Sequence, residues 1–578
     1  MSLLAHLQHQ GLQQVVLCPG SRSAPLALAA GGLARHGGLT LVTAIDERSA
    51  GFHALGLALA SGRATAVITT SGTAVANLLP AAVEADRSCI PLLLLTADRP
   101  TRLKDCGANQ TVNQEQFLAP VCRAFLSSPG EGLHHQDHGQ LQTLASTLWQ
   151  RALGSAGPVH LNVPFEEPLH PSETEQQAFW SAWQPLPAVG GEHRPAESRS
   201  TRSDGPVPDW SRPGVVVAGP WRGLEADRPA YQRALQELAL TTGWPVLLDP
   251  LAAAPQDLQG VIRHWDLMLP AGLPTPQPSL QVLRLGPLPA SRRLEAWLRA
   301  LGPGQWLISE GDCRSLDPLG LASQCSLGLS SWWDCVSPNP VALAPGPSAL
   351  LTAWRDLEAA VAGELARQLP QTGPVSEPAL MHGLPQLLPP ALPVMLAASS
   401  PVRDWQAFAA ADCGQRRCFS FRGASGIDGT LSLAVGLSRE LGSLVLITGD
   451  LALLHDSNGW LLASASAPPL LVLLIDNGGG GIFGQLPIPT VPAAEFDHLF
   501  AMPQAVDPLA LARAHAVPAR QLACLEDLPR ALEWGLDQQR PVLLRVCTNR
   551  MADAALRRML RREVEQALCA VQGSTKEG

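Results

Sequence analysis

Short apolar runs alternate with helical patterns along most of this chain, and the alternation predicts a parallel α/β architecture. Each run ends in a turn, as a buried strand does. Continuous apolar strands separated by helices imply parallel sheets that are covered on both faces. The predicted strands are Val15–Cys18, Leu41–Ile45, Ala66–Thr70 and Pro91–Thr96, then Gly214–Ala218, Pro245–Leu248, Gln281–Leu285 and Trp306–Ser309, and finally Val394–Ala398, Leu444–Thr448, Leu470–Ile475 and Pro541–Val546.

Polar, proline-rich stretches divide these strands into three groups. Residues 185–212 hold Pro, Gly, Ser and charge with little periodic apolar content, and residues 368–378 are similar, so both are predicted to be linkers. Another Pro-rich stretch, 336–347, precedes a predicted helix at Ser348–Leu369. Charges alternate at helical spacing over Arg550–Gln572, which predicts a solvated helix. The simplest organisation is three α/β domains, at residues 1–184, 213–370 and 371–578.

Composition narrows the class of protein. The chain has 578 residues, of which 46% are hydrophobic and 16% charged, so a folded protein with large cores is expected. Its net charge of -9 argues against nucleic acid, because phosphate binding needs a basic face. The apolar runs, such as Pro468–Ile475, are far shorter than the roughly 20 residues that span a bilayer. The opening residues lack the basic region of a signal peptide, so a soluble cytoplasmic protein is expected.

The twelve cysteines are scattered and form no C-x-x-C pair. In a chain of this size, the pattern favours reduced cysteines, mostly in the cores, over a zinc site or a disulfide framework.

Two loops after predicted strands of the first domain carry candidate chemistry. Ligands of open parallel sheets sit beyond the carboxyl ends of the strands. Ser21 and Arg22 follow the first strand at an expected helix N-terminus, which suits an anion, although a plain turn with a solvated Arg is the alternative. Asp46 and Glu47 follow the second strand, where a carboxylate is costly unless it is paired or functional. The alternative is an acid that interacts favourably with the helix dipole.

A third candidate is a pair of polar residues in the last domain. Asp450 and Asn477 each follow a strong apolar strand, and they are 477 − 450 = 27 residues apart, the length of one crossover between parallel strands. Their oxygens and a backbone carbonyl suit Mg2+, and the glycines after Asn477 allow close approach to a diphosphate. Asp312 and Asn339 have the same separation, 339 − 312 = 27, but no glycine run follows, so that pair is interpreted as chance.

Two further features complete the search for motifs. Arg422 lies among glycines in the segment 421–429, which suits an anion-gripping loop or a simple glycine-rich turn. His134, His135 and His138 could bind a metal, but they are expected in an exposed loop. The sequence contains no nucleophile elbow, no Walker A lysine and no H-E-x-x-H motif.

Several of these residues resemble a known enzyme superfamily. Asp450 with Asn477 is similar to the diphosphate–metal motif of thiamine-diphosphate enzymes, and Glu47 stands where that superfamily keeps its cofactor-activating glutamate. Longer stretches resemble the 2-succinyl-5-enolpyruvyl-6-hydroxy-3-cyclohexene-1-carboxylate synthases of menaquinone and phylloquinone biosynthesis. The middle domain resembles them mainly through Ser291–Arg293. The stretches are CPGSRSAPLALAA (18–30), IDERSAGFHALGLA (45–58), TTSGTAVANLLPAAVEA (69–85), LTADRPTRLKDCGANQ (95–110), RGASGIDGTLS (422–432) and NGGGGIFGQLP (477–487).

The resemblance implies a pyrimidine-binding domain, a central domain and a diphosphate-binding domain, in chain order. It implies thiamine diphosphate with Mg2+ or Mn2+, in a homodimer or homotetramer whose active sites lie at the subunit interface. The implied reaction is decarboxylation of 2-oxoglutarate and 1,4-addition of the resulting succinyl-semialdehyde unit to isochorismate. A thiamine-diphosphate decarboxylase or carboligase with another acceptor, and a non-catalytic metabolite-binding protein of the same fold, are the alternatives.

The resemblance also implies a role for each matching residue. Glu47 is the expected catalytic residue, and Arg292 stands where other members carry Lys. The expected metal ligands are Asp450, Asn477 and Gly479. The expected cofactor-binding residues are Glu47, Gly449, Asp450, Asn477, Gly479, Ile427, Ile482 and Phe483. The expected substrate-binding residues are Ser21, Arg22, Arg99, Asn109, Gln110, Arg292, Arg293, Ser399, Arg403, Arg422 and Leu486.

Overall fold

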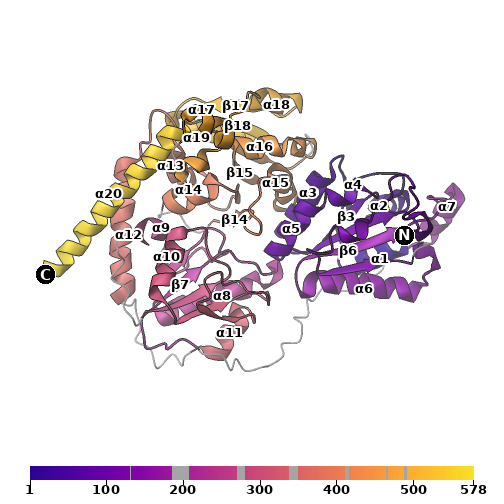
Figure 1. The fold of residues 1–578 in the computed structure, drawn as a ribbon, viewed down its shortest axis with the longest axis horizontal. Helices are drawn as coiled ribbons and strands as arrows, with labels where there is room; N and C mark the ends of the chain where they lie inside the picture. Colours follow the sequence, from indigo (N-terminus) through magenta and orange to yellow (C-terminus); the bar gives the residue numbers. More distant parts are fainter. Residues whose placement is uncertain are drawn as a thin grey trace.

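The computed structural model contains three six-stranded sheets, each flanked by helices (Figure 1). It describes residues 1–129, 132–184, 207–269, 280–337, 349–410, 416–463, 467–486 and 491–577. All pairings between neighbouring strands are parallel, so the predicted α/β class is confirmed. Most of the predicted linker 185–212 lies outside the described residues, as does most of the Pro-rich stretch 336–347, including Asn339.

The first sheet has the strand order β2-β1-β3-β4-β6-β5. Its strands are β1 Gln14–Leu17, β2 Thr40–Thr43, β3 Thr65–Thr69, β4 Leu92–Asp98, β5 Ala124–Ser127 and β6 Pro158–Pro164. Its helices are α1 Ser2–Gln10, α2 Ala24–Arg35, α3 Glu47–Ser61, α4 Thr73–Ala76, α5 Leu79–Ser88, α6 His138–Gly154 and α7 Glu173–Ala182. The expectation that the second strand is buried is wrong, because β2 lies at the sheet edge with Thr40 and Thr43 exposed.

The central sheet has the order β12-β11-β10-β7-β8-β9, so the chain reverses direction across the sheet between β7 and β10. Its strands are β7 Gly214–Ala218, β8 Val246–Leu248, β9 Val261–Ile262, β10 Gln281–Leu285, β11 Gln305–Ile308 and β12 Ala322–Cys325. Its helices are α8 Arg228–Thr242, α9 Trp265–Met268, α10 Arg292–Leu301, α11 Leu329–Val336 and α12 Ala349–Gln368. The last helix confirms the helix that was predicted at 348–369.

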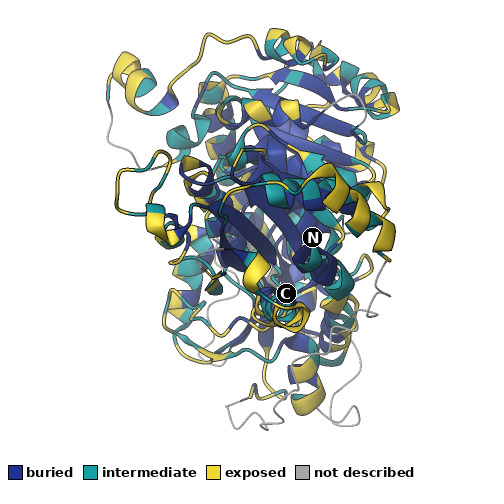
Figure 2. Ribbon diagram, turned by 90° about the vertical axis from the view of Figure 1, so that its right-hand side faces the viewer, coloured by how far each residue is buried: buried dark blue, intermediate teal, exposed yellow. Residues whose placement is uncertain are grey.

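The third sheet, β14-β13-β15-β16-β18-β17, repeats the relative strand order of the first. Its strands are β13 Val394–Leu396, β14 Cys418–Phe419, β15 Leu444–Gly449, β16 Leu470–Asp476, β17 Ala519–Leu522 and β18 Val542–Cys547. Its helices are α13 Glu377–Leu387, α14 Ser400–Phe408, α15 Thr430–Leu441, α16 Asp450–His455, α17 Ala493–Phe496, α18 Pro508–Ala514, α19 Leu528–Asp537 and α20 Arg550–Glu577. Figure 2 shows the strands in the buried colour and the exposed residues mainly on helices and loops.

Helices α3 and α15 join the first and third domains within the chain. They cross so closely that glycine is required at the contact. A Cβ atom at Gly56 would overlap the carbonyl oxygen of Leu433, and one at Gly436 would overlap the carbonyl oxygen of His53. The contact therefore fixes how α3, and Glu47 at its first turn, is placed relative to the third sheet.

The C-terminal helix α20 differs from its prediction as a solvated helix. It packs along α12 (Figure 1), and Leu560, Val564 and Leu568 of this helix belong to the core of the central and third domains. Asp553 and Arg557 are buried as well. The charge pattern had hidden one apolar face, because charged residues also occur on the buried side.

Two further predictions concerned membrane-spanning segments and the burial of the cysteines. Among the described residues, no helix combines the length and apolar character needed to cross a membrane. All described cysteines are free, but the expectation that most are buried is wrong. The exposed ones are Cys106, Cys313, Cys335, Cys547 and Cys569.

Candidate functional site

Asp450 and Asn477 lie at the same edge of the third sheet. Asp450 is the first residue of α16, directly after β15, and Asn477 directly follows β16. These strands pair in parallel, with Gly449 opposite Ile475, so their carboxyl ends coincide. The backbone N–H of Gly479 donates to Asp450 Oδ2 over 2.6 Å. The 27-residue spacing predicted that Asp450 and Asn477 lie at the same edge of the sheet, and this is confirmed.

The atoms at this edge fit a divalent cation with oxygen ligands. Asn477 Oδ1 is buried and accepts no hydrogen bond from the described residues. Burial raises the pKa of Asp450 to about 6, as expected for a carboxylate that lacks a neighbouring cation. Gly479 has a φ of 115°, and a Cβ atom there would overlap the carbonyl oxygen of Ala501. The loop can therefore approach a ligand at a place where a side chain would not fit.

A buried acid sets the orientation of Asn477. Asn477 Nδ2 donates to Glu377 Oε1 over 2.7 Å, and Glu377 is only 1% exposed. Because an ionised carboxylate only accepts hydrogen bonds, the amide nitrogen must face Glu377 and the amide oxygen must face away from it. Glu377 thereby leaves Asn477 Oδ1 free for another partner.

Arg557 of α20 holds this acid in turn. Its Nη2 donates to Glu377 Oε2 over 2.6 Å, and its Nε donates to Asp404 Oδ1 over 2.9 Å. Burial alone would lower the pKa of Arg557, but the carboxylates of Asp404 and Glu377 raise it above its ordinary value. Sequence reasoning missed this network, since Glu377 fell inside a predicted linker and Arg557 inside a predicted solvated helix.

The residues around Asn477 are also paired. Arg545 donates from Nε to Asp476 Oδ2 over 2.8 Å, which neutralises the acid next to the candidate metal ligands. Arg550 binds both the carbonyl oxygen of Gly478 and the carboxylate of Asp497. These contacts connect the glycine-rich loop to β18 and to the start of α20.

Three arginines of the predicted substrate set gather between the central and third domains. The pKa of Arg403 is lowered first by burial and then by the neighbouring charges of Arg422 and Arg292. Arg403 Nη1 also donates to the carbonyl oxygen of Ser399 over 2.6 Å, at the start of α14. Arg293, next in sequence to Arg292, pairs with Asp266 at 3.3 Å. The cluster brings together several guanidinium groups, which suit the recognition of carboxylates.

The loop that carries Arg422 is clamped by the first domain. Glu84 of α5 accepts hydrogen bonds from the backbone N–H groups of Gly423 and Ala424, over 2.8 and 2.6 Å. Glu84 is buried, so both bonds are shielded from water. The segment 421–429, which was predicted as an anion-binding loop or a simple turn, is therefore held in place by the first domain. The sequence did not indicate this contact.

A second cluster lies in the first domain, at the carboxyl ends of β1, β3 and β4. Arg22 is buried and donates to the carbonyl oxygen of Phe165 over 2.9 Å. Arg99 contacts Ser71, and its pKa is lowered by burial and then by Arg22. Gln110 Nε2 donates to the carbonyl oxygen of Ser71 over 2.9 Å. The remaining members of this predicted set, Ser21 and Asn109, are exposed.

Glu47 is the first residue of α3 and is half-buried. Asp46, not Glu47, caps the helix, because its side chain accepts from the backbone of Arg48 and Ser49 over 2.9 and 3.2 Å. Within the described part of the chain, the Glu47 carboxylate accepts no hydrogen bond. Its neighbour Ile45 is 81% exposed. Asp46 thus caps the helix, whereas Glu47 lies in the first turn of α3, where an acid interacts favourably with the helix dipole, as the alternative stated.

The apolar candidates lie near the Asn477 loop and before α15. Ile427 precedes α15, and its carbonyl oxygen accepts a hydrogen bond from Thr430. Ile482 and Phe483 lie in the short helical segment Gly481–Gln485, where Phe483 packs on Phe500. Leu486 is partly exposed at its end.

Two alternatives raised by the sequence take no part in this site. Asp312 forms an ion pair with Arg314 at 2.8 Å, which supports the interpretation of its spacing as chance. His134, His135 and His138 are exposed, as expected. In the described ranges, no group of three His, Cys, Asp or Glu side chains could hold a metal ion.

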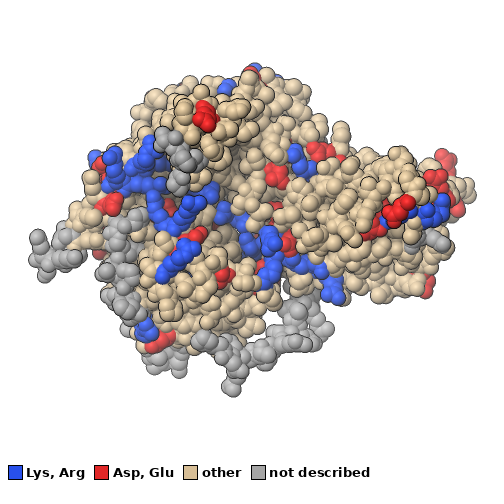
Figure 3. Space-filling model, in the orientation of Figure 1, with Lys and Arg blue, Asp and Glu red and all other residues tan. Residues whose placement is uncertain are grey.

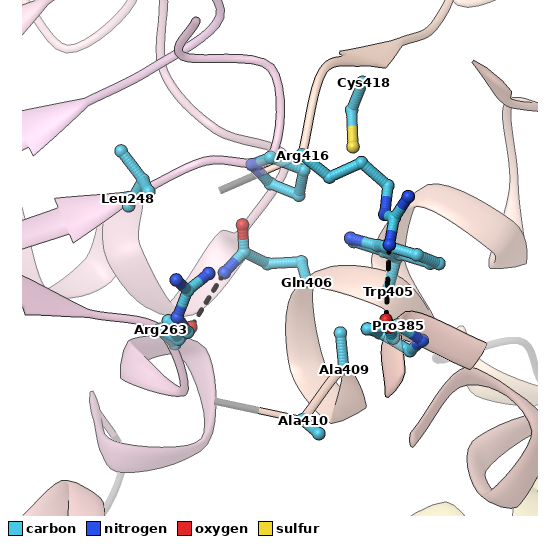
Figure 4. A pocket seen from close by; sticks show the side chains of 10 residues that line it. Leu248, Arg263, Pro385, Trp405, Gln406, Ala409, Ala410, Arg416 and Cys418 are labelled. Carbon is cyan, nitrogen blue, oxygen red and sulfur yellow. Dashed lines mark hydrogen bonds between the residues drawn. The ribbon is translucent and has the colours of Figure 1, made fainter. Parts of the chain in front are cut away.

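A small cavity lies where side chains of the central and third domains meet. Figure 4 shows Gln406 donating to the carbonyl oxygen of Arg263 and Arg416 donating to that of Pro385. Leu248 and Trp405 also line it, and its volume is about 50 Å³. None of the predicted site residues lines this cavity, and it is too small for the substrates expected here.

Comparison with known proteins identifies the class and then the family. Residues 2–117 match the family model "Thiamine pyrophosphate enzyme, N-terminal TPP binding domain", and residues 405–546 match the corresponding "C-terminal TPP binding domain". The fold and these two matches define a thiamine pyrophosphate enzyme.

Relatives named 2-succinyl-5-enolpyruvyl-6-hydroxy-3-cyclohexene-1-carboxylate synthase extend the match to the whole chain. One from Synechococcus sp. (strain WH7803) is 93% identical over 100% of both chains. Another, from Synechococcus sp. (strain CC9311), is 62% identical over 98% of this chain and 99% of its own. A third, from Prochlorococcus marinus (strain MIT 9313), is 59% identical over 95% and 97%. The chain belongs to this family of synthases.

Proposed function

We propose that this protein decarboxylates 2-oxoglutarate and adds the resulting succinyl-semialdehyde unit to isochorismate by 1,4-addition. The product would be 2-succinyl-5-enolpyruvyl-6-hydroxy-3-cyclohexene-1-carboxylate, an intermediate of menaquinone and phylloquinone biosynthesis. The observation that carries the proposal is the 93% identity over the full chain to a synthase of that name. The arrangement of Asp450, Asn477 and the arginine clusters supports it independently.

Thiamine diphosphate is assigned to the first and third domains. Its pyrimidine ring would lie in the domain at 1–184 and its diphosphate in the domain at 371–578. Asp450, Asn477 and the backbone carbonyl of Gly479 would bind Mg2+, or Mn2+ in its place, beside the diphosphate, with Gly449 at the same loop. The free, buried Asn477 Oδ1 is the feature that supports this most directly.

The cofactor supplies the carbon nucleophile and the electron sink for decarboxylation when it is bound. Glu47 would exchange a proton with the pyrimidine nitrogen N1′, a task that suits a carboxylate with no other hydrogen bond. Ile427 would pack against the rings of the cofactor. Ile482, Phe483 and Leu486 would exclude water from the reacting carbon.

The arginines would bind the carboxylates of the substrates, both of which are dianions. Arg422 and Arg292 lie close enough to Arg403 to lower the pKa of its guanidinium. A guanidinium pairs with a carboxylate through two parallel hydrogen bonds, so each substrate carboxylate would offset one positive charge. The other members would be Arg293, Arg22 and Arg99, with Ser21, Ser399, Asn109 and Gln110 as hydrogen-bonding partners.

A homodimer or homotetramer is proposed, with each site built from two chains. Both halves of the site expose apolar side chains, which is typical of a surface that another chain covers. Ile45 lies next to Glu47, whereas Leu486, Leu499 and Met502 lie near the glycine loop. We place the assembly in the cytoplasm, where 2-oxoglutarate is a common metabolite.

The direct test of the proposed reaction is product analysis. Purified protein is incubated with thiamine diphosphate, Mg2+, 2-oxoglutarate and isochorismate, and products are analysed by mass spectrometry. We expect a product whose mass equals the two substrates minus carbon dioxide, and none from Glu47→Gln. Carbon dioxide without the adduct would retain the class of enzyme and reject isochorismate as the acceptor.

Subunit mixing tests the two-chain site. Glu47→Gln and Asn477→Ala are each expected to inactivate the protein. If each site takes Glu47 from one chain and Asn477 from the other, a mixed dimer regains one intact site, and activity rises after the inactive variants are mixed and exchanged. If both residues of a site come from one chain, every mixed site keeps a defect and no activity returns.

A further inference from the structure

The C-terminal helix carries a cluster of arginines that the proposed site does not use. Arg558, Arg561 and Arg562 of α20 line an open hollow of about 590 Å³ together with Arg293 of α10. Arg561 and Arg562 lie three and four positions after Arg558, so both are its neighbours on one side of the helix. Figure 3 shows Lys and Arg atoms along α20 and continuing across this face of the molecule toward its centre.

The cluster has a surplus of positive charge. Asp266 pairs with Arg293 at 3.3 Å, and it also accepts a hydrogen bond from Ser291. Arg558 and Arg562 are exposed, and in the described part of the chain neither has an ion-pair partner. The Arg561 Nε atom is buried and donates to no described acceptor. The like charges repel one another, and a bound anion would offset that repulsion.

The cluster is continuous with the arginines of the proposed substrate site. The pKa of Arg561 is lowered by burial and then by the charge of Arg293. Arg293 adjoins Arg292, whose charge acts on Arg403. Arginines therefore extend from the outer side of α20 toward the loop of Arg422, with Asp266 as a counter-charge beside Arg293. A surface with a surplus of positive charge concentrates anions and speeds their association.

We propose that Arg558, Arg561 and Arg562 form an outer anion-binding site that collects dicarboxylate substrates and delivers them to the arginines beside α14. The size of the hollow suits a small dicarboxylate, and forked guanidinium groups suit carboxylates. This inference rests on the proposed function, because it takes the substrates to be dianions. It adds a site to that function and leaves the reaction unchanged.

The test compares two double variants of equal charge. Arg558→Gln with Arg562→Gln removes two outer cations, whereas Arg151→Gln with Arg233→Gln removes two exposed cations from α6 and α8, which the proposal does not use. For the α20 variant we expect the KM for 2-oxoglutarate and isochorismate to rise by about threefold or more at low salt, with kcat unchanged. The control variant should keep the KM of the wild type.

Salt provides the second readout. The screening length falls from about 10 Å at 0.1 M to about 3 Å at 1 M ionic strength, so the difference between the α20 variant and the wild type should disappear at high salt. An equal KM in the two proteins at low salt would overturn the proposal. A fall in kcat alone would overturn it too, since the site is proposed to act before chemistry.

A binding measurement separates this inference from the proposed function. Succinate is a dicarboxylate that cannot be decarboxylated, and its binding to the cofactor-loaded protein can be followed by calorimetry. Weaker succinate binding by the α20 variant than by the control would support the outer site even if no product formed from isochorismate. Equal binding by both would reject the outer site even if the reaction proceeds as proposed.

Discussion

Replacing Glu377 tests whether a residue that touches no ligand sets the metal site. Glu377→Ala removes the acceptor of Asn477 Nδ2 and one of the two carboxylates that hold Arg557. Asn477 could then rotate its amide, and Oδ1 would no longer be fixed toward the cation. Loss of a residue that orients a metal ligand costs about 10–100-fold in metal affinity. The stability cost should be lower than the roughly 3–5 kcal/mol of a fully unpaired buried charge, because Asp404 still pairs with Arg557.

Glu377→Gln gives a sharper version of the same test. A Gln side chain has one acceptor and one donor end, whereas Asn477 Nδ2 and Arg557 Nη2 both require an acceptor. One of these donors must therefore lose its partner, or Asn477 must turn its oxygen toward Gln. We expect weaker Mg2+ binding in this variant too, although its side chain has nearly the same shape.

The assay is the Mg2+ concentration that half-saturates the thermal shift caused by thiamine diphosphate, measured for each variant. Asp404→Asn is the matched control, because it weakens the Arg557 pair without touching Asn477. It should lower the Tm of the protein and leave the Mg2+ midpoint within about twofold of the wild type. If Glu377→Ala folds and keeps the wild-type midpoint, Glu377 does not orient the ligand. If Asp404→Asn shifts the midpoint as much, the effect belongs to stability in general.

Three further predictions follow from single positions. Gly56→Ala should lower the free energy of unfolding by about 1–3 kcal/mol, and with it the Tm, because its Cβ overlaps Leu433. Gly363→Ala on α12 meets nothing within 4 Å and should leave the Tm unchanged. Gly479→Ala should abolish the thiamine diphosphate and Mg2+ thermal shift, and an unchanged shift would contradict the tight loop. Burial lowers the pKa of His53 to about 3, so from pH 6.5 downward the unfolded chain takes up a proton that the folded chain does not, and stability falls. His53→Leu should therefore show a smaller drop in Tm between pH 8 and pH 5 than the wild type, and an equal drop would refute this.

The central strands of each sheet could be predicted, and the missed strands share a physical reason. Gly214–Ala218 and Gln281–Leu285 were predicted with the observed bounds, because buried strands are continuous apolar runs. Five of the missed strands lie at sheet edges, where short or half-exposed segments carry little apolar signal: β5, β9, β12, β14 and β17. The missed strand β6 is wholly buried but contains His160 and Asn162, which bond to polar groups of neighbouring segments.

The candidate site was predictable where ligands follow strands directly and was not where they depend on packing. The positions of Asp450 and Asn477 could be inferred from spacing, since the carboxyl ends of adjacent parallel strands meet at one edge. No spacing connects Glu377 to Asn477, which are 100 residues apart, or to Arg557, which is 180 away. Their association depends on how α13 and α20 pack on the third sheet, and that information is not in any local pattern.

Helix α20 contributes to both the metal site and the proposed outer anion-binding site. Its buried face supplies Arg557 to the acid that orients Asn477, and its outer face supplies Arg558 and Arg562 to the surface that we propose collects substrates. These roles use neighbouring residues that point in different directions, so they can be separated by mutation. Charge removal at Arg558 and Arg562 should change KM and leave the Mg2+ midpoint alone, whereas Glu377→Ala should do the reverse. If either change moved both quantities, the helix would act through its overall packing and neither role could be assigned to single side chains.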